Sequence, residues 1–342
     1  MTAKTNHQYY FFIHNKSLKS FPVSVLLFAF IFFSGCNHDK QYYVCQGNIF
    51  HTSYHIKYEY SGLLDDAIEA ELRRFDLSLN PFNPQSIISK VNNNEPVEVD
   101  SFFITVFNKA QEVSRASGGA FDITAAPLIN LWGFGFSKMD SISPAVIDSL
   151  KQYVGYEKIR LEGNQVIKAF PQMQLNASAI AKGYACDVIG RLLDSYGIRN
   201  YMVEIGGEVR AKGKNPKGVC WRIEISKPEY DPTGIVQERQ TVVPLCDKGM
   251  ATSGNYRNFY MKDGMTFGHT INPATGYPAE QNILSATVIA SDCMTADAYA
   301  TAFMVLGIEA SVALAKKLPG LQYYLIGGMP GGKQEIVSNL SF

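Results

Sequence analysis

The sequence lacks any excess of charge, and it lacks the repeats and linkers that divide a chain into several parts. Its 342 residues include 31 basic and 31 acidic side chains. Proteins that bind nucleic acid usually present a basic field, so this balance predicts no nucleic-acid partner. Hydrophobic residues make up 46% of the chain and charged residues 18%, which is typical of a globular protein with a real core. Without a low-complexity segment or a clear linker, one continuous domain is the better interpretation.

Six cysteines are present, but none of them forms a CxxC pair or a Cys/His spacing typical of metal sites. Cys186 and Cys293 lie in apolar sequence, which favours small core residues over nucleophiles. If Cys36 is modified, the five cysteines that remain cannot all pair. An oxidising compartment permits a disulfide, but the sequence alone does not choose one.

The N-terminus carries a targeting segment. Lys16 and Lys19 precede an apolar run of 13 residues, Phe21–Phe33, which is shorter than the roughly 20 residues of a transmembrane helix and suits a signal-peptide core. The run leads into Phe-Ser-Gly-Cys, which resembles a bacterial lipoprotein signal with Cys36 as the lipidated residue. The alternative is an uncleaved N-terminal anchor. Both interpretations predict an extracytoplasmic, membrane-tethered protein. The lipoprotein interpretation divides the chain into a signal peptide at 1–35, a tether at 36–46 and a folded domain at 47–342.

Residues 175–210 form the stretch around which the rest of the chain is organised. Apolar residues recur every four positions and predict a helix over Ala179–Tyr196. Asn176 and Ser178 are placed to cap the first N–H groups of that helix, and a short strand with a glycine turn follows. Gly183 lies inside the helix, where it costs about 1 kcal/mol relative to Ala. Close packing or a closely approaching ligand would explain that cost.

Hairpin-like strands and intervening helices along the rest of the chain predict an α+β fold. The expected helices are Leu63–Leu77, Ser101–Ser117, Ser141–Tyr153, the second half of 285–307, and Ile308–Lys317. The expected strands are Asn48–Tyr60, 154–163, 166–170, Tyr201–Ile205, Trp221–Ile225, Thr241–Leu245, the first half of 285–307, and Leu321–Ile326. A glycine-rich turn at 327–332 lacks the Lys-Ser/Thr of a phosphate loop.

Two segments of the C-terminal half suit phosphate chemistry. Thr252-Ser253-Gly254 combines hydroxyls with a flexible backbone. His269 is a base that could take a proton from an attacking hydroxyl, although a histidine that only orients a turn is the alternative. Asp297 and Thr301 are four residues apart on one helix face, and both offer oxygen. Hard ions such as Mg²⁺ take oxygen ligands, but this spacing alone does not establish a metal site.

Five ordered segments resemble the ApbE family of flavin transferases (FAD:protein FMN transferases). They are FDLSLNPFNPQSIISKVN at 75–92, AFDITAAPLINLWGFG at 120–135, LNASAIAKGYACD with IGGEVR inside 175–210, ATSGNYRNFY at 251–260 with GHTINPATGYPA at 268–279, and SATVIASDCMTADAYATAFMVLG at 285–307. The resemblance covers residues 47–327. It implies a single α+β domain with two closely packed lobes and a flavin cleft between them.

The resemblance also implies FAD as the substrate and Mg²⁺ as the cofactor. By position, the implied flavin contacts are Phe50, Phe82, Ala120, Phe121, Asp122, Asn176, Lys182, Thr252, Ser253, Gly254 and Ile271. The implied metal ligands are Asp297, Thr301 and the backbone carbonyl of Ala179, and His269 is the catalytic candidate. The chain departs from the family at His51 for Gly, Asn272 for Asp and Asn176 for Asp. Asn176 can still hydrogen-bond, but it carries no charge.

These residues favour an enzyme that transfers FMN from FAD to a Thr or Ser hydroxyl of a partner protein and releases AMP. Since the family modifies subunits of membrane redox complexes, the implied partner is an extracytoplasmic flavin-accepting domain. A metal-dependent FAD pyrophosphatase, in which water replaces the hydroxyl, would use the same residues. A non-enzymatic FAD-binding lipoprotein is the third hypothesis. The Asp297 and Thr301 pair argues against it, because a carrier does not need to activate the pyrophosphate.

Overall fold

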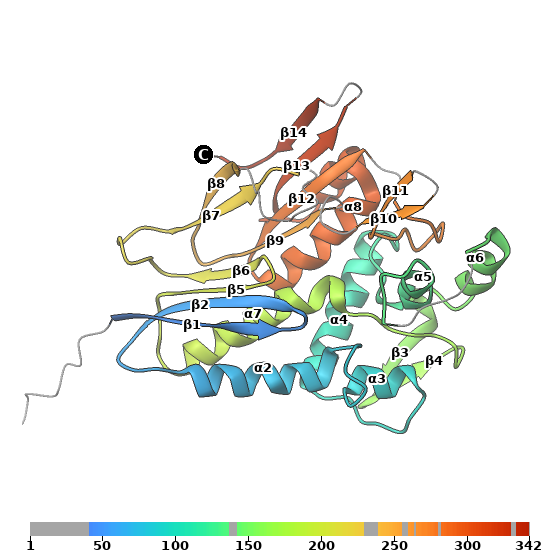
Figure 1. Ribbon diagram of the computed structural model, residues 1–342, viewed down its shortest axis with the longest axis horizontal. Helices are drawn as coiled ribbons and strands as arrows, with labels where there is room; N and C mark the ends of the chain where they lie inside the picture. The colour runs from blue at the N-terminus through green and yellow to red at the C-terminus, as the bar shows by residue number, and fades with distance from the viewer. Residues whose placement is uncertain are drawn as a thin grey trace, which may run out of the picture. The chain divides into compact units, whose positions relative to one another are not determined.

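Eight antiparallel strands form the central sheet (Figure 1). In β5 the residues at positions 201, 203 and 205 are buried and those between them are partly exposed, which is the two-residue period of a strand. From one edge to the other, the strands are β1 (Gln41–Ile49), β2 (Thr52–Tyr60), β5 (Tyr201–Ile205), β6 (Glu208–Lys212), β9 (Gly249–Gly254), β12 (Ile283–Ala290), β13 (Gln322–Gly328) and β14 (Gln334–Ser338).

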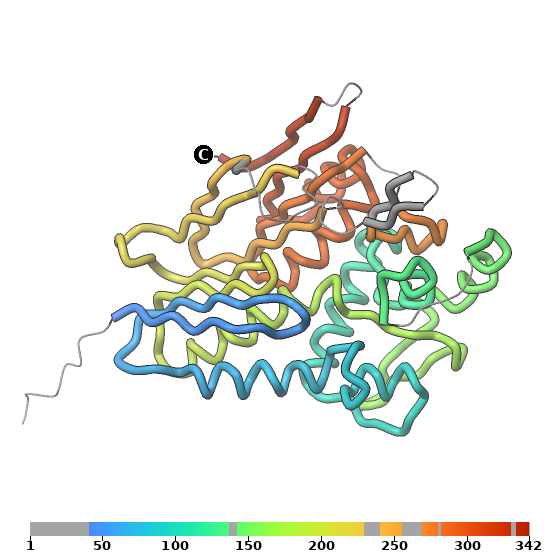
Figure 2. Tube along the Cα trace, in the orientation of Figure 1, coloured from blue at the N-terminus to red at the C-terminus, as the bar shows by residue number. Residues whose placement is uncertain are grey.

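The computed structural model describes residues 41–136, 142–228, 239–254, 259–262, 265–279, 282–329 and 333–341. These residues all belong to one compact unit, and Figure 2 traces its chain from the β1–β2 hairpin to the C-terminal strands. The predicted signal peptide, the lipidation site Cys36 and the start of the predicted tether lie outside the described residues.

Helices cover one face of the sheet (Figure 1). The two central helices, α7 (Ser178–Ser195) and α8 (Cys293–Ala315), pack against each other. Helix α7 also packs against β5 and β6, and α8 packs against β9 and β12. By length and composition α8 could cross a membrane, but more than half of its apolar window is buried inside the fold, as in a core helix. The helices are α2 (Asp65–Leu79), α3 (Ile87–Asn92), α4 (Ser101–Ala116), α5 (Ala126–Leu131), α6 (Pro144–Lys151), α7 (Ser178–Ser195) and α8 (Cys293–Ala315), with 3₁₀ turns η1 (Ile123–Ala125) and η2 (Tyr156–Lys158).

A two-stranded sheet, β7 (Trp221–Ser226) with β8 (Arg239–Leu245), packs against part of the central sheet and forms a second core with it. Ile223 and Ile225 of β7 belong to this core together with Ile289 and Ile326 of the central sheet. A disulfide joins Cys220 to Cys246 at the end of the β7–β8 pair, which identifies the pairing that the sequence left open. Two further hairpins are β3 (Ile159–Glu162) with β4 (Gln165–Lys168), and β10 (Phe259–Lys262) with β11 (Met265–Gly268).

The predicted bounds of the tether and of the first strand are wrong. Residues 41–46 belong to β1, and the segment predicted as a single strand over 48–60 contains the end of β1, the turn and all of β2. The chain turns at Phe50 and His51, whose φ angles are 52° and 59°. Non-glycine residues rarely adopt positive φ. Two-residue turns of this kind usually contain glycine or asparagine. Because Phe50 and His51 occupy these positions instead, the turn could not be recognised in the sequence.

The α+β fold is confirmed, and most predicted elements are present within a few residues. Ser178 is the first residue of α7 and not its cap, whereas Asn176 Oδ1 accepts the Ser178 N–H at 2.8 Å as predicted. The predicted helix at 308–317 is the continuation of α8 beyond a kink at Gly307, where φ is 77°. The strand β14 was not predicted, because its sequence QEIVS is short and almost fully exposed.

Candidate functional site

A cavity of about 1110 Å³ lies where the β1–β2 turn, the segment after α4, the start of α7, strand β9 and helix α8 meet. Every residue that the sequence predicted for the site lines this cavity. The predicted residues among its walls are Phe50, Phe82, Ala120, Phe121, Asp122, Asn176, Ala179, Lys182, Thr252, Ser253, Gly254, His269, Ile271, Asp297 and Thr301. The structure thus brings together residues that are up to 251 positions apart in the chain.

Helices α7 and α8 pack tightly against each other at Gly183. A Cβ at this position would lie 2.7 Å from Cβ of Asp297 and even closer to the carbonyl of Cys293, so only glycine fits. The Gly183 N–H donates to Asp297 Oδ2 at 2.9 Å. In a regular helix this amide pairs with the carbonyl four residues earlier, which belongs to Ala179. The carboxylate therefore competes with the Ala179 carbonyl for the amide, and both Ala179 and Asp297 line the same cavity.

Side chains with oxygen atoms that could bind a metal ion line the cavity wall next to this contact. The hydroxyls of Ser253 and Thr301 are 3.3 Å apart, and those of Thr252 and Thr287 are 2.9 Å apart. Asp297 is only 2% exposed. Burial raises the pKa of its carboxyl, while the Lys182 ammonium and the Gly183 amide act in the opposite direction.

These donors fit Mg²⁺, which prefers hard oxygen ligands and keeps several waters. In the part of the chain that the structure describes, no three His, Cys, Asp or Glu side chains come together as a metal site. A Mg²⁺ ion here would therefore depend on Asp297, Thr301 and the Ala179 carbonyl, and on oxygens from water or a bound phosphate.

Lys182 enters the cavity from α7, one turn after Ala179. Its Nζ is 3.4 Å from Glu208 Oε1 and donates to the Ser178 carbonyl at 3.4 Å. Burial alone would lower the pKa of Lys182, but the carboxylates of Glu208 and Asp297 raise it above its ordinary value. At neutral pH the ammonium is charged, and 30% of the side chain is exposed. It is thus available to an anionic ligand.

Glu208 is the most important residue that the sequence reasoning missed. It is the first residue of β6, directly after the Gly206-Gly207 turn, and it is 4% exposed. Burial raises the pKa of its carboxyl, and Lys182 opposes that change. A charged residue directly after two glycines, at the start of a short strand, is the signal that could have identified it. Other missed residues along the cavity are Thr52, Ser53, Glu204, Ile223, Glu224 and Ser226.

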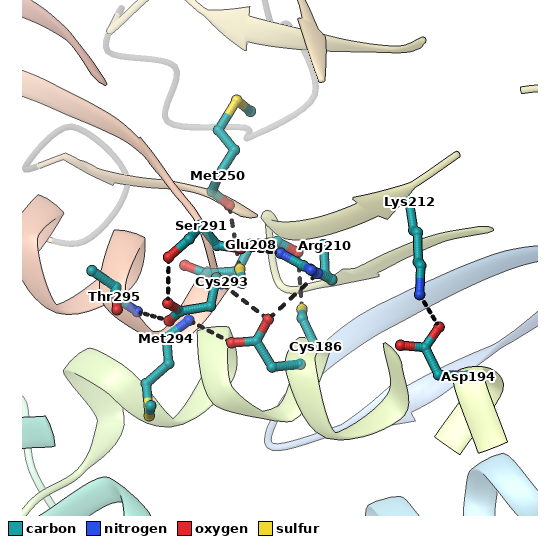
Figure 3. A network of polar contacts seen from close by, with 12 residues as sticks. Cys186, Asp194, Glu208, Arg210, Lys212, Met250, Ser291, Cys293, Met294 and Thr295 are labelled. Atoms are coloured by element: carbon teal, nitrogen blue, oxygen red, sulfur yellow. Dashed lines mark hydrogen bonds and ion pairs between the residues drawn. The ribbon is translucent and has the colours of Figure 1, made fainter. Parts of the chain in front are cut away.

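A network behind the cavity holds the start of α8 in place (Figure 3). Asp187, on α7, accepts the backbone N–H groups of Cys293 at 3.0 Å and Met294 at 2.8 Å. Arg210 approaches the same carboxylate to 3.9 Å and donates to the Ser291 carbonyl. A carboxylate at a helix N-terminus satisfies free amides and complements the helix dipole. The network therefore fixes the start of the helix that carries Asp297.

Aromatic rings line another part of the cavity. The Phe82 ring is 46% exposed and lies 5.5 Å from the ring of His51, and the Phe50 ring lies 5.5 Å from that of Phe75. The His269 ring is 6.3 Å from the Phe134 ring in an edge-to-face arrangement. Such rings offer stacking surfaces to a flat ligand.

Two predicted flavin contacts have structural hydrogen bonds of their own. Asp122 accepts the Thr124 N–H and hydroxyl, at 2.8 and 2.7 Å, and the Tyr156 N–H at 2.8 Å. The Asn176 N–H donates to the Ile123 carbonyl at 2.8 Å. Both residues line the cavity, but the Asp122 side chain and the Asn176 backbone also hold together the loops around it.

Comparisons with known proteins agree with this geometry. Residues 50–325 match the model of the ApbE family. The FAD:protein FMN transferase of Vibrio cholerae is 36% identical over 303 residues, which is 85% of this chain and 90% of that protein. The transferase of the same name from Haemophilus influenzae is 35% identical, over 86% of this chain and 88% of the relative. The solved structure of flavin transferase ApbE from Vibrio cholerae matches with a TM-score of 0.79 at 33% identity and covers 89% of this chain and 98% of its own. The chain therefore belongs to the ApbE family.

Proposed function

We propose that this chain transfers FMN from FAD to a Thr or Ser hydroxyl of an acceptor protein and releases AMP, in a Mg²⁺-dependent reaction. The observation that carries the proposal is the convergence of all the predicted site residues on one cavity. Flavin transfer from FAD to protein is the activity in the names of the relatives, and the chain covers about nine-tenths of their length.

In this reaction the acceptor hydroxyl oxygen attacks the FMN-side phosphorus of FAD. A new P–O bond forms, the bond to the AMP phosphate breaks, and the hydroxyl proton is removed. His269 is the candidate to take that proton, as a neutral imidazole. Lys182 would hold the diphosphate through its ammonium, and the exposed Phe82 ring would pack on the flavin. When bound to Asp297, Thr301 and the Ala179 carbonyl, Mg²⁺ would supply Lewis-acid stabilisation of the phosphate charge.

The acceptor and the cellular location extend the proposal further. The signal-like run before Cys36 supports a lipid-anchored protein on the extracytoplasmic side of a membrane. An acceptor within reach of such an anchor would be an extracytoplasmic domain of a membrane redox complex.

The test is to incubate the full chain with FAD, Mg²⁺ and a candidate acceptor domain. Intact mass spectrometry then detects FMN on the acceptor, and an enzymatic assay measures AMP. We expect a mass gain of one FMN and equimolar AMP with the unaltered chain, and neither with Asp297→Ala. Glu309→Ala is the matched control, because Glu309 lies on the same helix but is exposed and outside the cavity.

The two alternatives give different results in the same assay. AMP and free FMN without any mass gain, across a panel of acceptors, would indicate the metal-dependent FAD pyrophosphatase. Bound FAD with no AMP would indicate a flavin-binding lipoprotein. Either pattern would contradict the proposed transfer.

A further inference from the structure

The Glu208 carboxylate has one oxygen that the fold does not use. Glu208 Oε1 is 3.4 Å from Lys182 Nζ. Glu208 Oε2 is buried and has no hydrogen-bond partner among the residues that the structure describes. A buried carboxylate oxygen without a partner costs the full desolvation penalty of the group. A ligand that donates a hydrogen bond would remove this cost, and Glu208 lines the cavity in which a ligand would lie.

The neighbouring turn positions this carboxylate. Gly206 has φ of 65°, a conformation that strains any other residue, and a Cβ there would lie 3.0 Å from Thr52 and 3.1 Å from Lys182 Cδ. The Gly207 N–H donates to Glu204 Oε1 at 2.7 Å and closes the turn. Glu208 therefore follows a turn whose conformation is determined on both sides, and Lys182 lies directly against it.

The contrast with Glu204 shows that the free oxygen is specific to Glu208. Glu204 lines the same cavity. Its Oε1 accepts from Gly207, and its Oε2 contacts His55 Nδ1 at 2.9 Å. Both oxygens of Glu204 are thus used by the fold, whereas only one oxygen of Glu208 is.

We propose that Glu208 Oε2 accepts a hydrogen bond from a hydroxyl of the bound nucleotide, next to the phosphates that Lys182 holds. This inference rests on the proposed function, because FAD carries ribityl and ribose hydroxyls on either side of its diphosphate. A carboxylate can only accept hydrogen bonds, and it is a common partner for sugar hydroxyls. A second metal ion is the less favourable occupant. It would lie close to the Lys182 ammonium, which already supplies positive charge to this carboxylate.

The test compares FAD with inorganic pyrophosphate, at saturating Mg²⁺, on the full chain and on Glu208→Gln. Simple electrostatics predicts that removing a negative charge beside the phosphates tightens the binding of both anions. If Glu208 instead accepts a hydrogen bond from a hydroxyl of FAD, the loss of that bond weakens FAD binding and does not weaken pyrophosphate binding. We expect FAD affinity to fall about tenfold, as for a charged hydrogen bond, and pyrophosphate affinity to stay equal or rise. Glu309→Gln, at an exposed glutamate of α8 outside the cavity, is the matched control and should change FAD affinity less than threefold.

Each other result overturns the inference in a recognisable way. If FAD and pyrophosphate both bind more weakly, Glu208 acts only by positioning Lys182. If FAD binds equally or more tightly, the oxygen has no ligand partner. If FAD affinity is restored by more Mg²⁺, the oxygen binds metal. Flavin transfer is measured separately, so a chain that binds FAD but transfers nothing contradicts the proposed function and leaves the affinity comparison valid. A chain that binds pyrophosphate but no FAD contradicts both.

Discussion

Gly183→Ala tests whether the close approach of α7 and α8 holds the site together. Two effects oppose each other in this substitution. Alanine is favoured over glycine inside a helix by about 1 kcal/mol, whereas forcing an extra methyl group into a packed core costs about 1–3 kcal/mol. The new Cβ would meet Asp297 Cβ at 2.7 Å and the Cys293 backbone carbonyl, neither of which is the end of a flexible side chain. We therefore expect the packing cost to dominate, with a net loss of up to about 2 kcal/mol in the free energy of unfolding.

Urea denaturation of the full chain measures this loss, and Gly190→Ala is the matched control on the same helix. A Cβ at Gly190 would meet the Tyr201 hydroxyl at 3.0 Å and Arg210 Cγ at 3.4 Å, contacts that a shift of a few tenths of an ångström relieves. Gly190→Ala should therefore leave stability unchanged or raise it. Gly183→Ala should also raise the Mg²⁺ concentration needed for half-maximal activity, because α8 carries Asp297. A Gly183→Ala chain as stable as the Gly190→Ala chain would refute the packing argument.

Four further substitutions probe other parts of the structure. Cys220→Ser opens the disulfide to Cys246, and for a separation of 26 residues the chain-entropy model predicts a loss of about 3.5 kcal/mol in urea denaturation; an unchanged midpoint would contradict it. Burial raises the pKa of Asp187 to about 6, so its contribution to stability is present below pH 4 and is lost as the pH rises through 6. Asp187→Asn should flatten thermal stability over that window, and parallel wild-type and variant curves would argue against it. His51→Gly should raise the unfolding free energy by about 1 kcal/mol, because φ is 59° at this position; no gain in calorimetry would mean that the turn is not strained. Thr301→Val removes the hydroxyl 3.3 Å from Ser253 and should raise the Mg²⁺ requirement several-fold in the AMP assay, while an unaltered requirement would exclude Thr301 as a ligand.

The sequence predicted the site best where the presence of a residue type could be explained by a single structural requirement. The cost of a glycine inside a helix pointed to a close contact, and the structure places Asp297 at that contact. The four-residue spacing of Asp297 and Thr301 put both on one face, and both line the cavity. Local patterns of this kind are set by helix geometry, so they survive folding unchanged.

Long-range pairing was beyond what the sequence could predict. Cys220 pairs with Cys246 because β7 and β8 are neighbours. Pro232 and Gly234 predict a connection between the two strands, but they do not establish that the strands pair with each other. Similarly, β1 pairs with β2 through a turn at Phe50 and His51, two residue types that rarely take positive φ. In both cases the deciding interactions are tertiary, and they override the local preference of the residues involved.

The same limit explains why Glu208 was missed and why it matters. Sequence alone treats a Glu after two glycines as an exposed strand end, since carboxylates are rarely buried without partners. The fold instead places Glu208 and Asp297 in one buried group with a single ammonium, that of Lys182. Burial raises the pKa of both carboxyl groups, so the fold does not fully compensate their charge, and such an arrangement is costly unless a ligand does so. A fold selected for stability alone would favour apolar residues at these positions, so we expect these two groups to serve ligand binding.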